Sequence, residues 1–316
     1  MTCKGSASYS RSQYMEGAFD SMRRIILPAT AVVALPLLLS ACGSTSAIIS
    51  TAHLSPQAAV DAAYRVAGAS PTSFHLNETV NITVNKKGYG GSTISGDVYS
   101  DPSHTSGSYA SLTENLSVLG KSEGSLLTLV KNNNVYINAG GIHLSGVSVT
   151  PGWKVMSLSN YFSELNSASS SSVSPTITTS AQSSLLPALI NDAKISASGS
   201  STVGGQAVNV YTASISYPKL IKALSTSNGV LATALSKTLS LYQMTGTATV
   251  TIDIAKSNNR VASVAAVFAS TFAPVKGSPT KYHFDLAVQQ QYSNYGVKFT
   301  VKTPASAKTV TSFKGL

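Results

Sequence analysis

The residues with the clearest potential for catalysis are Ser122, in the pattern Gly120-Lys121-Ser122-Glu123-Gly124, and five histidines. In hydrolases a Gly-x-Ser-x-Gly serine lies on a sharp turn between a buried strand and a helix. The residues after this motif have the pattern of a strand, so we do not expect a nucleophile. The histidines are His53, His75, His104, His143 and His283. None has a partner three or four residues away on a helix, so neither a metal site nor a catalytic base is indicated. We therefore expect no catalytic residue, no metal and no cofactor.

A different chemistry is indicated further upstream, where an uncharged apolar run extends from Ile25 to Leu39. Arg23 and Arg24 precede the run and small residues follow it, which is the order of a secretion signal. The run is shorter than the roughly 20 apolar residues that cross a bilayer core. This length favours a segment that is removed over one that stays in the membrane.

The end of this signal, residues 39–42 (Leu-Ser-Ala-Cys), resembles the bacterial lipobox. The resemblance implies that the Cys42 thiol is alkylated by diacylglycerol and that the chain is cut just before it. Two acyl chains hold a protein durably on a membrane, whereas one gives marginal binding. The alternative is an ordinary buried thiol behind a general signal peptide.

These observations divide the chain into three parts. Residues 1–41 are expected to be the signal region, with translation starting at Met22, because the polar lead before it is unusual for a signal. Residues 42–54 are expected to be the lipidated cysteine and a Ser- and Thr-rich tether. Residues 55–316 are expected to form a single domain on the outer side of the cell membrane.

Composition limits the partners of this domain. The formal net charge is +10, but the basic residues are scattered, and beyond the signal region only Arg65 and Arg260 could contact a phosphate in bidentate fashion. A mild attraction to anionic headgroups fits this pattern better than nucleic acid. No cysteine follows Cys42, so an exported domain must be held together by its core rather than by disulfides.

The first elements of the domain are a helix and a long strand. Ser55 is a good N-cap and Pro56 suits the first helical position. From residue 72 the hydrophobic period changes from helical to two, which predicts a strand with one apolar face; its apolar residues include Phe74, Leu76, Val80 and Ile82. Glu78 falls on that face, either with its side chain reaching solvent at a strand edge or bulge, or as a polar group inside a cavity.

The rest of the chain is read in the same way. Strands are expected at 93–100, after a glycine turn at 88–91, and at 106–118, 125–131, 134–138, 194–200, 207–217, 248–254, 261–270, 282–289 and 297–301. Helices are expected at 155–165, 183–192 and, interrupted, 218–242, with Trp153 in the core at a strand-to-helix junction. A serine-rich run at 167–179 breaks the regular pattern, as a flap or as a linker. Consecutive strands without intervening helices predict an antiparallel sheet, and the helices are expected across one of its faces.

In order, these parts resemble the LppX and LprG type of mycobacterial lipoproteins, which share the fold of the periplasmic carrier LolA. The resemblance rests on the lipobox, the opening helix at Ser55, Trp153 before a helical insert, and segments 203–211, 250–253, 292–296 and 303–304. It implies an α+β fold, in which a curved antiparallel half-barrel has helices over its concave face and encloses a cavity for the acyl chains of lipids or glycolipids.

The sequence therefore predicts a monomeric, membrane-anchored carrier of lipid or glycolipid. The residues expected to line its cavity are Phe74, Leu76, Val80, Ile82, Leu185, Leu189, Leu220, Leu224, Leu231 and Leu235. One alternative is a surface-anchored interaction or adhesion module with a solid core. Another is an envelope hydrolase, which requires a serine, a histidine and an acidic residue within hydrogen-bond reach.

Overall fold

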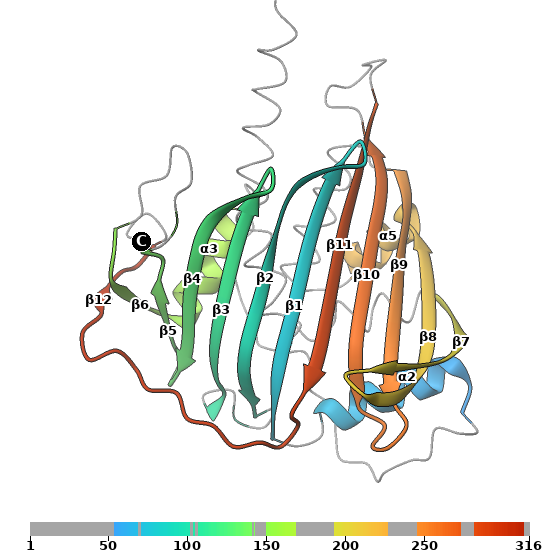
Figure 1. The fold of residues 1–316 in the computed structure, drawn as a ribbon, viewed down its shortest axis with the longest axis horizontal. Helices are drawn as coiled ribbons and strands as arrows, with labels where there is room; N and C mark the ends of the chain where they lie inside the picture. Colours follow the sequence, from blue (N-terminus) through green and yellow to red (C-terminus); the bar gives the residue numbers. More distant parts are fainter. Residues whose placement is uncertain are drawn as a thin grey trace, which may run out of the picture.

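A computed structural model describes residues 54–68, 71–101, 104, 107–140, 142, 150–168, 193–226, 245–272 and 281–312. Its main feature is one twelve-stranded sheet (Figure 1), with the strand order β12-β6-β5-β4-β3-β2-β1-β11-β10-β9-β8-β7. The strands are β1 (Thr72–Val84), β2 (Lys87–Ser100), β3 (Tyr109–Val118), β4 (Lys121–Lys131), β5 (Asn134–Asn138), β6 (Trp153–Ser157), β7 (Lys194–Val203), β8 (Gln206–Ser216), β9 (Thr245–Ala255), β10 (Val261–Phe272), β11 (Tyr282–Ser293) and β12 (Lys308–Thr309). All neighbours pair antiparallel except β6 and β12, which pair parallel.

In the described part of the chain, three helices pack on one side of this sheet: α2 (Pro56–Gly68), α3 (Leu158–Ala168) and α5 (Tyr217–Thr226). The main contacts of α2 are with β7, β9 and β10, those of α3 are with β5 and β6, and those of α5 are with β8 and β9. We call this side of the sheet the covered face and the opposite side the uncovered face. The predicted fold class, an α+β fold with a curved, open, mostly antiparallel sheet, is confirmed.

The hairpin between β1 and β2 corrects one prediction. The turn lies at Asn85 and Lys86, both with positive φ (51° and 64°), and not at the glycines that follow. Gly91 and Gly96 lie inside β2, where the backbones of neighbouring strands approach closely: a Cβ on Gly96 would come within 2.0 Å of the Ser111 carbonyl oxygen. Glycine in a strand interior is typical of such a close approach.

The residues that follow Trp153, the first residue of β6, also differ from the prediction. The segment 155–157 belongs to β6, whose pairing with β5 overrides its helical pattern. α3 begins only at Leu158, and the Ser157 hydroxyl accepts a hydrogen bond from the Asn160 backbone N–H (3.1 Å). Ser157 is therefore the N-cap that sets the start of this helix.

The apolar alternation at 297–301 does not form a strand. The segment after β11 passes across the ends of several strands to reach β12 (Figure 1). Side chains at the strand ends donate to its carbonyl oxygens instead of a backbone ladder: Ser73 to Val297 (2.6 Å), Tyr109 to Phe299 (3.3 Å) and Lys131 to Val301 (2.7 Å). Because the segment crosses the strands, it cannot pair along any one of them.

Replacing Gly96 with alanine tests the close approach between β2 and β3. The added Cβ meets backbone atoms rather than a flexible side chain, so we expect G96A to lower the free energy of unfolding by about 3 kcal/mol. The measurement is urea unfolding followed by circular dichroism. G88A is the matched control, because a Cβ on Gly88 has no atom within 4 Å; equal midpoints for the two variants would contradict the prediction.

Candidate functional site

The covered face of β1 carries the residues that the sequence predicts for a ligand cavity. Phe74, Leu76, Val80 and Ile82 are all buried there, and Leu220 is buried in α5. Leu224 belongs to α5 as well. The other residues predicted to line the cavity lie outside the described part of the chain: Leu185, Leu189, Leu231 and Leu235. Cys42, the predicted site of lipidation, lies outside it as well. The role of these residues in binding therefore stays a prediction, whereas the burial of the apolar face of β1 is observed.

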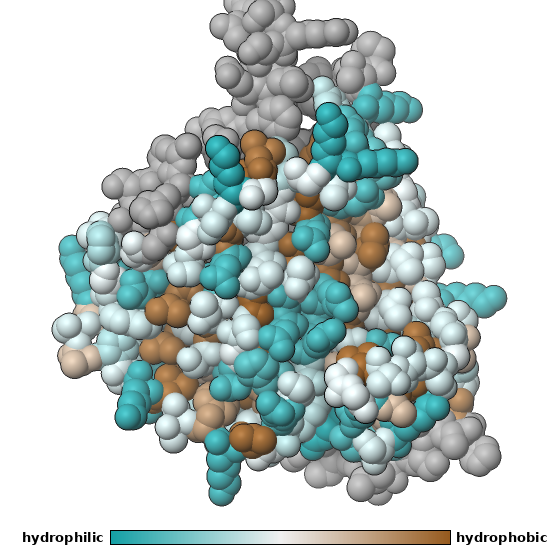
Figure 2. Space-filling view, viewed as in Figure 1, coloured by the Kyte–Doolittle hydropathy of each residue, from teal (hydrophilic) through white to brown (hydrophobic). Residues whose placement is uncertain are grey.

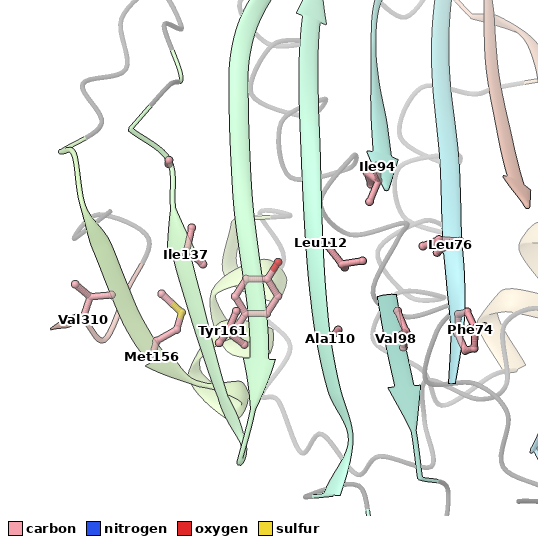
Figure 3. Close-up of a cluster of buried hydrophobic side chains, with 12 residues drawn as sticks. Phe74, Leu76, Ile94, Val98, Ala110, Leu112, Ile137, Met156, Tyr161 and Val310 are labelled. Atoms are coloured by element: carbon pink, nitrogen blue, oxygen red, sulfur yellow. The ribbon is translucent and has the colours of Figure 1, made fainter. Parts of the chain in front are cut away.

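The described residues of the covered face form two apolar clusters, one on each half of the sheet. The first runs from β1 to β6 and includes Leu76, Ile94, Leu112 and Tyr161 (Figure 3). The second joins α2 to β8, β9 and β10. Tyr292 of β11 packs against both clusters. The boundary between the two halves therefore lies where β1 pairs with β11.

Polar side chains lie at this boundary, in one row that crosses the strands. In the backbone register, Glu78 of β1 is opposite Gln290 of β11 on one side and Ile94 of β2 on the other, and Ile94 is opposite Glu114 of β3. Directly opposed residues of antiparallel strands point to the same face. Glu78 and Gln290 are each 1 % exposed and Glu114 is 7 % exposed. We call Glu78, Glu114 and Gln290 the polar row.

Glu78 therefore does not reach solvent, and the first of the two interpretations of its sequence position is wrong. It lies in the middle of a central strand, and the irregularity between β1 and β2 is at Ile82 and Thr83. The structure describes a buried polar group on an apolar face, as the second interpretation requires.

Hydrogen bonds hold one oxygen of Glu78, and one oxygen of each glutamate in the polar row has no hydrogen-bond partner. Tyr292 Oη donates to Gln290 Oε1 (2.8 Å), and Gln290 Nε2 donates to Glu78 Oε2. The second oxygen of Glu78, Oε1, and Oε1 of Glu114 are buried without a hydrogen-bond partner. Buried polar atoms normally have a partner, and leaving one unpaired costs about 1 to 3 kcal/mol.

The apolar surroundings change the titration of both carboxyl groups. Burial raises the pKa of Glu78 to about 7; the hydrogen bond from Gln290 opposes this rise, and repulsion from Glu114 adds to it. Burial also raises the pKa of Glu114, and the neighbouring Ser92 hydroxyl opposes that rise. Both groups are therefore held toward the neutral, protonated form, which can donate as well as accept a hydrogen bond.

Tyrosines from two helices border the polar row. Burial raises the pKa of Tyr161 in α3, and the charge of Glu114 raises it further. Tyr64 of α2 has a buried hydroxyl without a hydrogen-bond partner. Burial raises the pKa of Tyr292 well above its ordinary value, with further contributions from Tyr64, Tyr295 and Glu78. These contributions place Tyr161 near Glu114, and Tyr64 and Tyr295 near Tyr292.

Comparisons with solved structures find similar proteins of low identity. The lipoprotein LppX from Mycobacterium tuberculosis is 12 % identical, with a TM-score of 0.40, over 78 % of this chain and 98 % of that chain. LprF from Mycobacterium bovis is 16 % identical, with a TM-score of 0.42, over 79 % of this chain and 97 % of that chain. No protein-family profile and no curated protein matches the sequence.

The uncovered face brings together a serine, a histidine and an aspartate, which the sequence analysis missed. His75 Nδ1 lies 2.7 Å from Asp97 Oδ1, and His75 Nε2 lies 3.2 Å from Ser95 Oγ. The three residues come from β1 and β2, and the bulge at Ile82 sets the register in which His75 faces Asp97. A two-residue turn at Asn85 and Lys86 without the bulge would place His75 opposite Gly96, so the turn residues alone do not predict that His75 faces Asp97.

The distances resemble a catalytic triad, but the surroundings do not suit acyl transfer. Ser95 Oγ donates to Asn77 Oδ1 (2.7 Å), so its proton is directed to an amide oxygen rather than to the imidazole. β1 and β2 are each paired on both sides, so their ladder N–H groups are not available to an oxyanion. Hydrophilic side chains occupy the middle of this face, which is open to water (Figure 2). We interpret the cluster as a surface hydrogen-bond network that joins the two strands.

The described residues offer neither a metal site nor a membrane-spanning helix. They contain no group of three or more His, Cys, Asp or Glu side chains arranged to hold a metal ion. None of the helices in the described part of the chain has the length and apolar character to cross a bilayer.

The raised pKa of Glu78 makes stability depend on pH. The folded state binds this proton more tightly than the unfolded state, where the pKa is near 4.5, so stability falls as pH rises from about 4.5 to about 7. E78Q mimics the neutral form at every pH, and we expect it to remove about 3 kcal/mol of this loss at pH 8. The measurement is urea unfolding at pH 5 and pH 8. E123Q, on the less buried Glu123 of β4, is the control; a parallel loss in wild type and E78Q would contradict the prediction.

The network on the uncovered face gives a second prediction. Because Ser95 lacks oxyanion donors and directs its proton to Asn77, we expect the protein to hydrolyse p-nitrophenyl acetate no faster than the S95A variant. A fluorophosphonate probe should likewise leave Ser95 unmodified, as judged by peptide mass spectrometry. Labelling of wild type that disappears in S95A would show that the serine is a nucleophile.

Proposed function

We propose that this protein is a lipoprotein that holds the acyl chains of a lipid or glycolipid against the covered face of its sheet. The observation that carries the proposal is the position of the described helices. On the covered face, α3 contacts β5 and β6 near one end of the strand order, and α2 and α5 contact β7 to β10 near the other end, whereas the strands between these two groups, β1, β2, β3 and β11, carry buried apolar side chains. Hydrocarbon bound over these central strands would lie between the two sets of helices.

Apolar burial is a sufficient driving force for such binding. Each methylene transferred from water to an apolar surface contributes about 0.8 kcal/mol. A chain of sixteen carbons would therefore gain on the order of ten kcal/mol before the entropy cost of binding. The apolar side chains of β1 and its neighbours provide this surface, among them Leu76, Val80 and Ile94.

The proposal also includes the membrane anchor at Cys42, in a monomer on the outer side of the cell membrane. Its support is the lipobox-like sequence at residues 39–42 and the basic and apolar order that precedes it. A protein that exchanges lipid with a membrane benefits from being held there, and a diacylglyceryl group provides durable attachment. The positive net charge of the chain adds a weak attraction to anionic headgroups. We assign no catalytic activity to the domain.

Lipid bound by the protein can be measured directly. We expect organic extracts of the full chain, purified in detergent from a bacterial envelope, to contain lipid at close to one molecule per protein by mass spectrometry. V80D places a charge on the covered face and should reduce this amount, while T79D, on the uncovered face of the same strand, serves as the control. Extracts free of lipid, together with no uptake of a fluorescent fatty acid, would contradict the proposal.

The anchor has its own test. Growth with an alkyne fatty acid should label the wild-type chain, and C42A should abolish the label and move the protein out of the membrane fraction. The alkyne is carried by the acyl chains of the anchor, so the label reports modification of this thiol. C3A is the control for the other cysteine. Labelling that survives in C42A would exclude Cys42 as the acylated residue.

A further inference from the structure

Two buried carboxyl groups on the covered face each leave one oxygen without a partner. Glu78 and Glu114 lie in the same cross-strand row, separated by Ile94 of β2. Adjacent strands are about 4.8 Å apart, so the two backbones are about 10 Å apart, and glutamate side chains can narrow that separation. Repulsion from Glu114 adds to the rise in the pKa of Glu78 that burial causes, which is consistent with two carboxyl groups at close range.

Cations do not explain the burial of this pair. Among the described residues, His75 pairs with Asp97, His104 with Asp101 and His283 with Asp285, and none of these ion pairs involves either glutamate. Gln290 donates to only one oxygen of Glu78, and Oε1 of each glutamate is buried and unpaired. Both residues are more than nine-tenths buried. Such atoms require a hydrogen-bond donor, or the protein loses the energy of solvating them.

We propose that Glu78 and Glu114 together bind a hydroxyl group of the lipid that occupies the covered face. This inference rests on the proposed function and specifies the class of ligand: a lipid with a hydroxyl on its chain or on an uncharged head group, rather than a plain hydrocarbon chain. The hydroxyl donates to one unpaired carboxyl oxygen and accepts from the other carboxyl group when that group is protonated.

The electrostatics of the row favour a hydroxyl over a charged group. An anionic headgroup would meet two acidic side chains, and no basic side chain among the described residues forms an ion pair with them. An ammonium group would require ionised carboxylates in apolar surroundings, where burial favours the neutral form. A hydroxyl matches neutral carboxyl groups, because each partner can both donate and accept.

Tyr292 and Gln290 act as positioning residues for this site. The chain of hydrogen bonds from Tyr292 through Gln290 holds Oε2 of Glu78. With that oxygen occupied, the other is left for the ligand. Because Gln290 and Tyr292 are both on β11, the backbone pairing of β11 with β1 keeps the acceptor in place.

The test is a competition between three uncharged lipids for the full chain in detergent, measured by native mass spectrometry. The probes are methyl stearate, methyl 12-hydroxystearate and monostearoylglycerol, which carry no hydroxyl, a hydroxyl on the chain and hydroxyls on the head group. We expect wild type to prefer at least one hydroxylated probe to methyl stearate by about tenfold, the effect of one buried hydrogen bond. The preferred probe shows whether the hydroxyl comes from the chain or from the head group.

Variants of the row connect this preference to the glutamates. In E78L and E114L, the ratio of bound hydroxylated probe to bound methyl stearate should fall close to one, and both variants should still bind methyl stearate. I94V changes packing in the same row without removing a polar group, and it should keep the wild-type preference. If E78L or E114L does not fold, the thermal midpoint of wild type gives the answer, because the hydroxylated probe must raise it more than methyl stearate does.

The outcomes separate this inference from the proposed function. Equal binding of all three probes by wild type would overturn the assignment of a hydroxyl while leaving lipid binding intact. A preference that persists in both leucine variants would also overturn it, since the hydroxyl would then be bound elsewhere. Failure of every probe to bind would overturn the proposed function and this inference with it.

Discussion

Backbone pairing of β1 with β2 and β11 is the constraint on which the covered face depends. Side chains alternate along each strand, so the register decides which residues point toward the helices. In the observed register Glu78 lies between Gln290 and Ile94. A slip of one residue would turn Glu78 to the solvent and bring Asn77 or Thr79 inside. The position of the carboxyl group is therefore set by the same bonds that form the sheet.

Burial then gives this carboxyl group its properties. In water a glutamate has many donors for its oxygens, but beside Leu76 and Val80 the one donor that the described residues offer to Glu78 is Gln290. The unpaired oxygen lowers the stability of the folded state. The fold withstands this loss because the sheet around Glu78 is extensive and β1 is paired on both sides. Local features that oppose stability in an otherwise consistent structure are typical of functional sites. This is the physical reason for placing ligand recognition at the polar row.

The uncovered face shows how much the surroundings decide. His75, Ser95 and Asp97 lie at distances that would suit a nucleophile and its base. They are at the centre of a paired sheet, where backbone donors are used by the ladders and the side chains of His75 and Asp97 are partly exposed to solvent. The same types of residue that define chemistry in an enzyme pocket here join two strands. The described residues of the covered face include no such cluster, but they provide the apolar environment in which a single hydrogen bond has a large effect.

The sequence by itself determined the elements that depend on local periodicity and turn chemistry. The alternation from residue 72 predicted β1, and the gap between the strands predicted at 125–131 and 134–138 is a turn in which Asn132 and Asn133 both have positive φ. The order of strands and helices also predicted the antiparallel, one-sided architecture. These features follow from contacts between residues close in the chain, or from the period of the apolar pattern.

Only the tertiary structure decided the features that depend on pairing between distant residues. The helical pattern of 155–157 gave way to pairing with β5, and the alternating segment 297–301 crosses the strand ends instead of joining the sheet. The meeting of Glu78 with Gln290 and the approach of Glu114 join residues far apart in sequence. Register and burial arise from the whole sheet, so no local pattern could show whether Glu78 would reach water or lie unpaired inside.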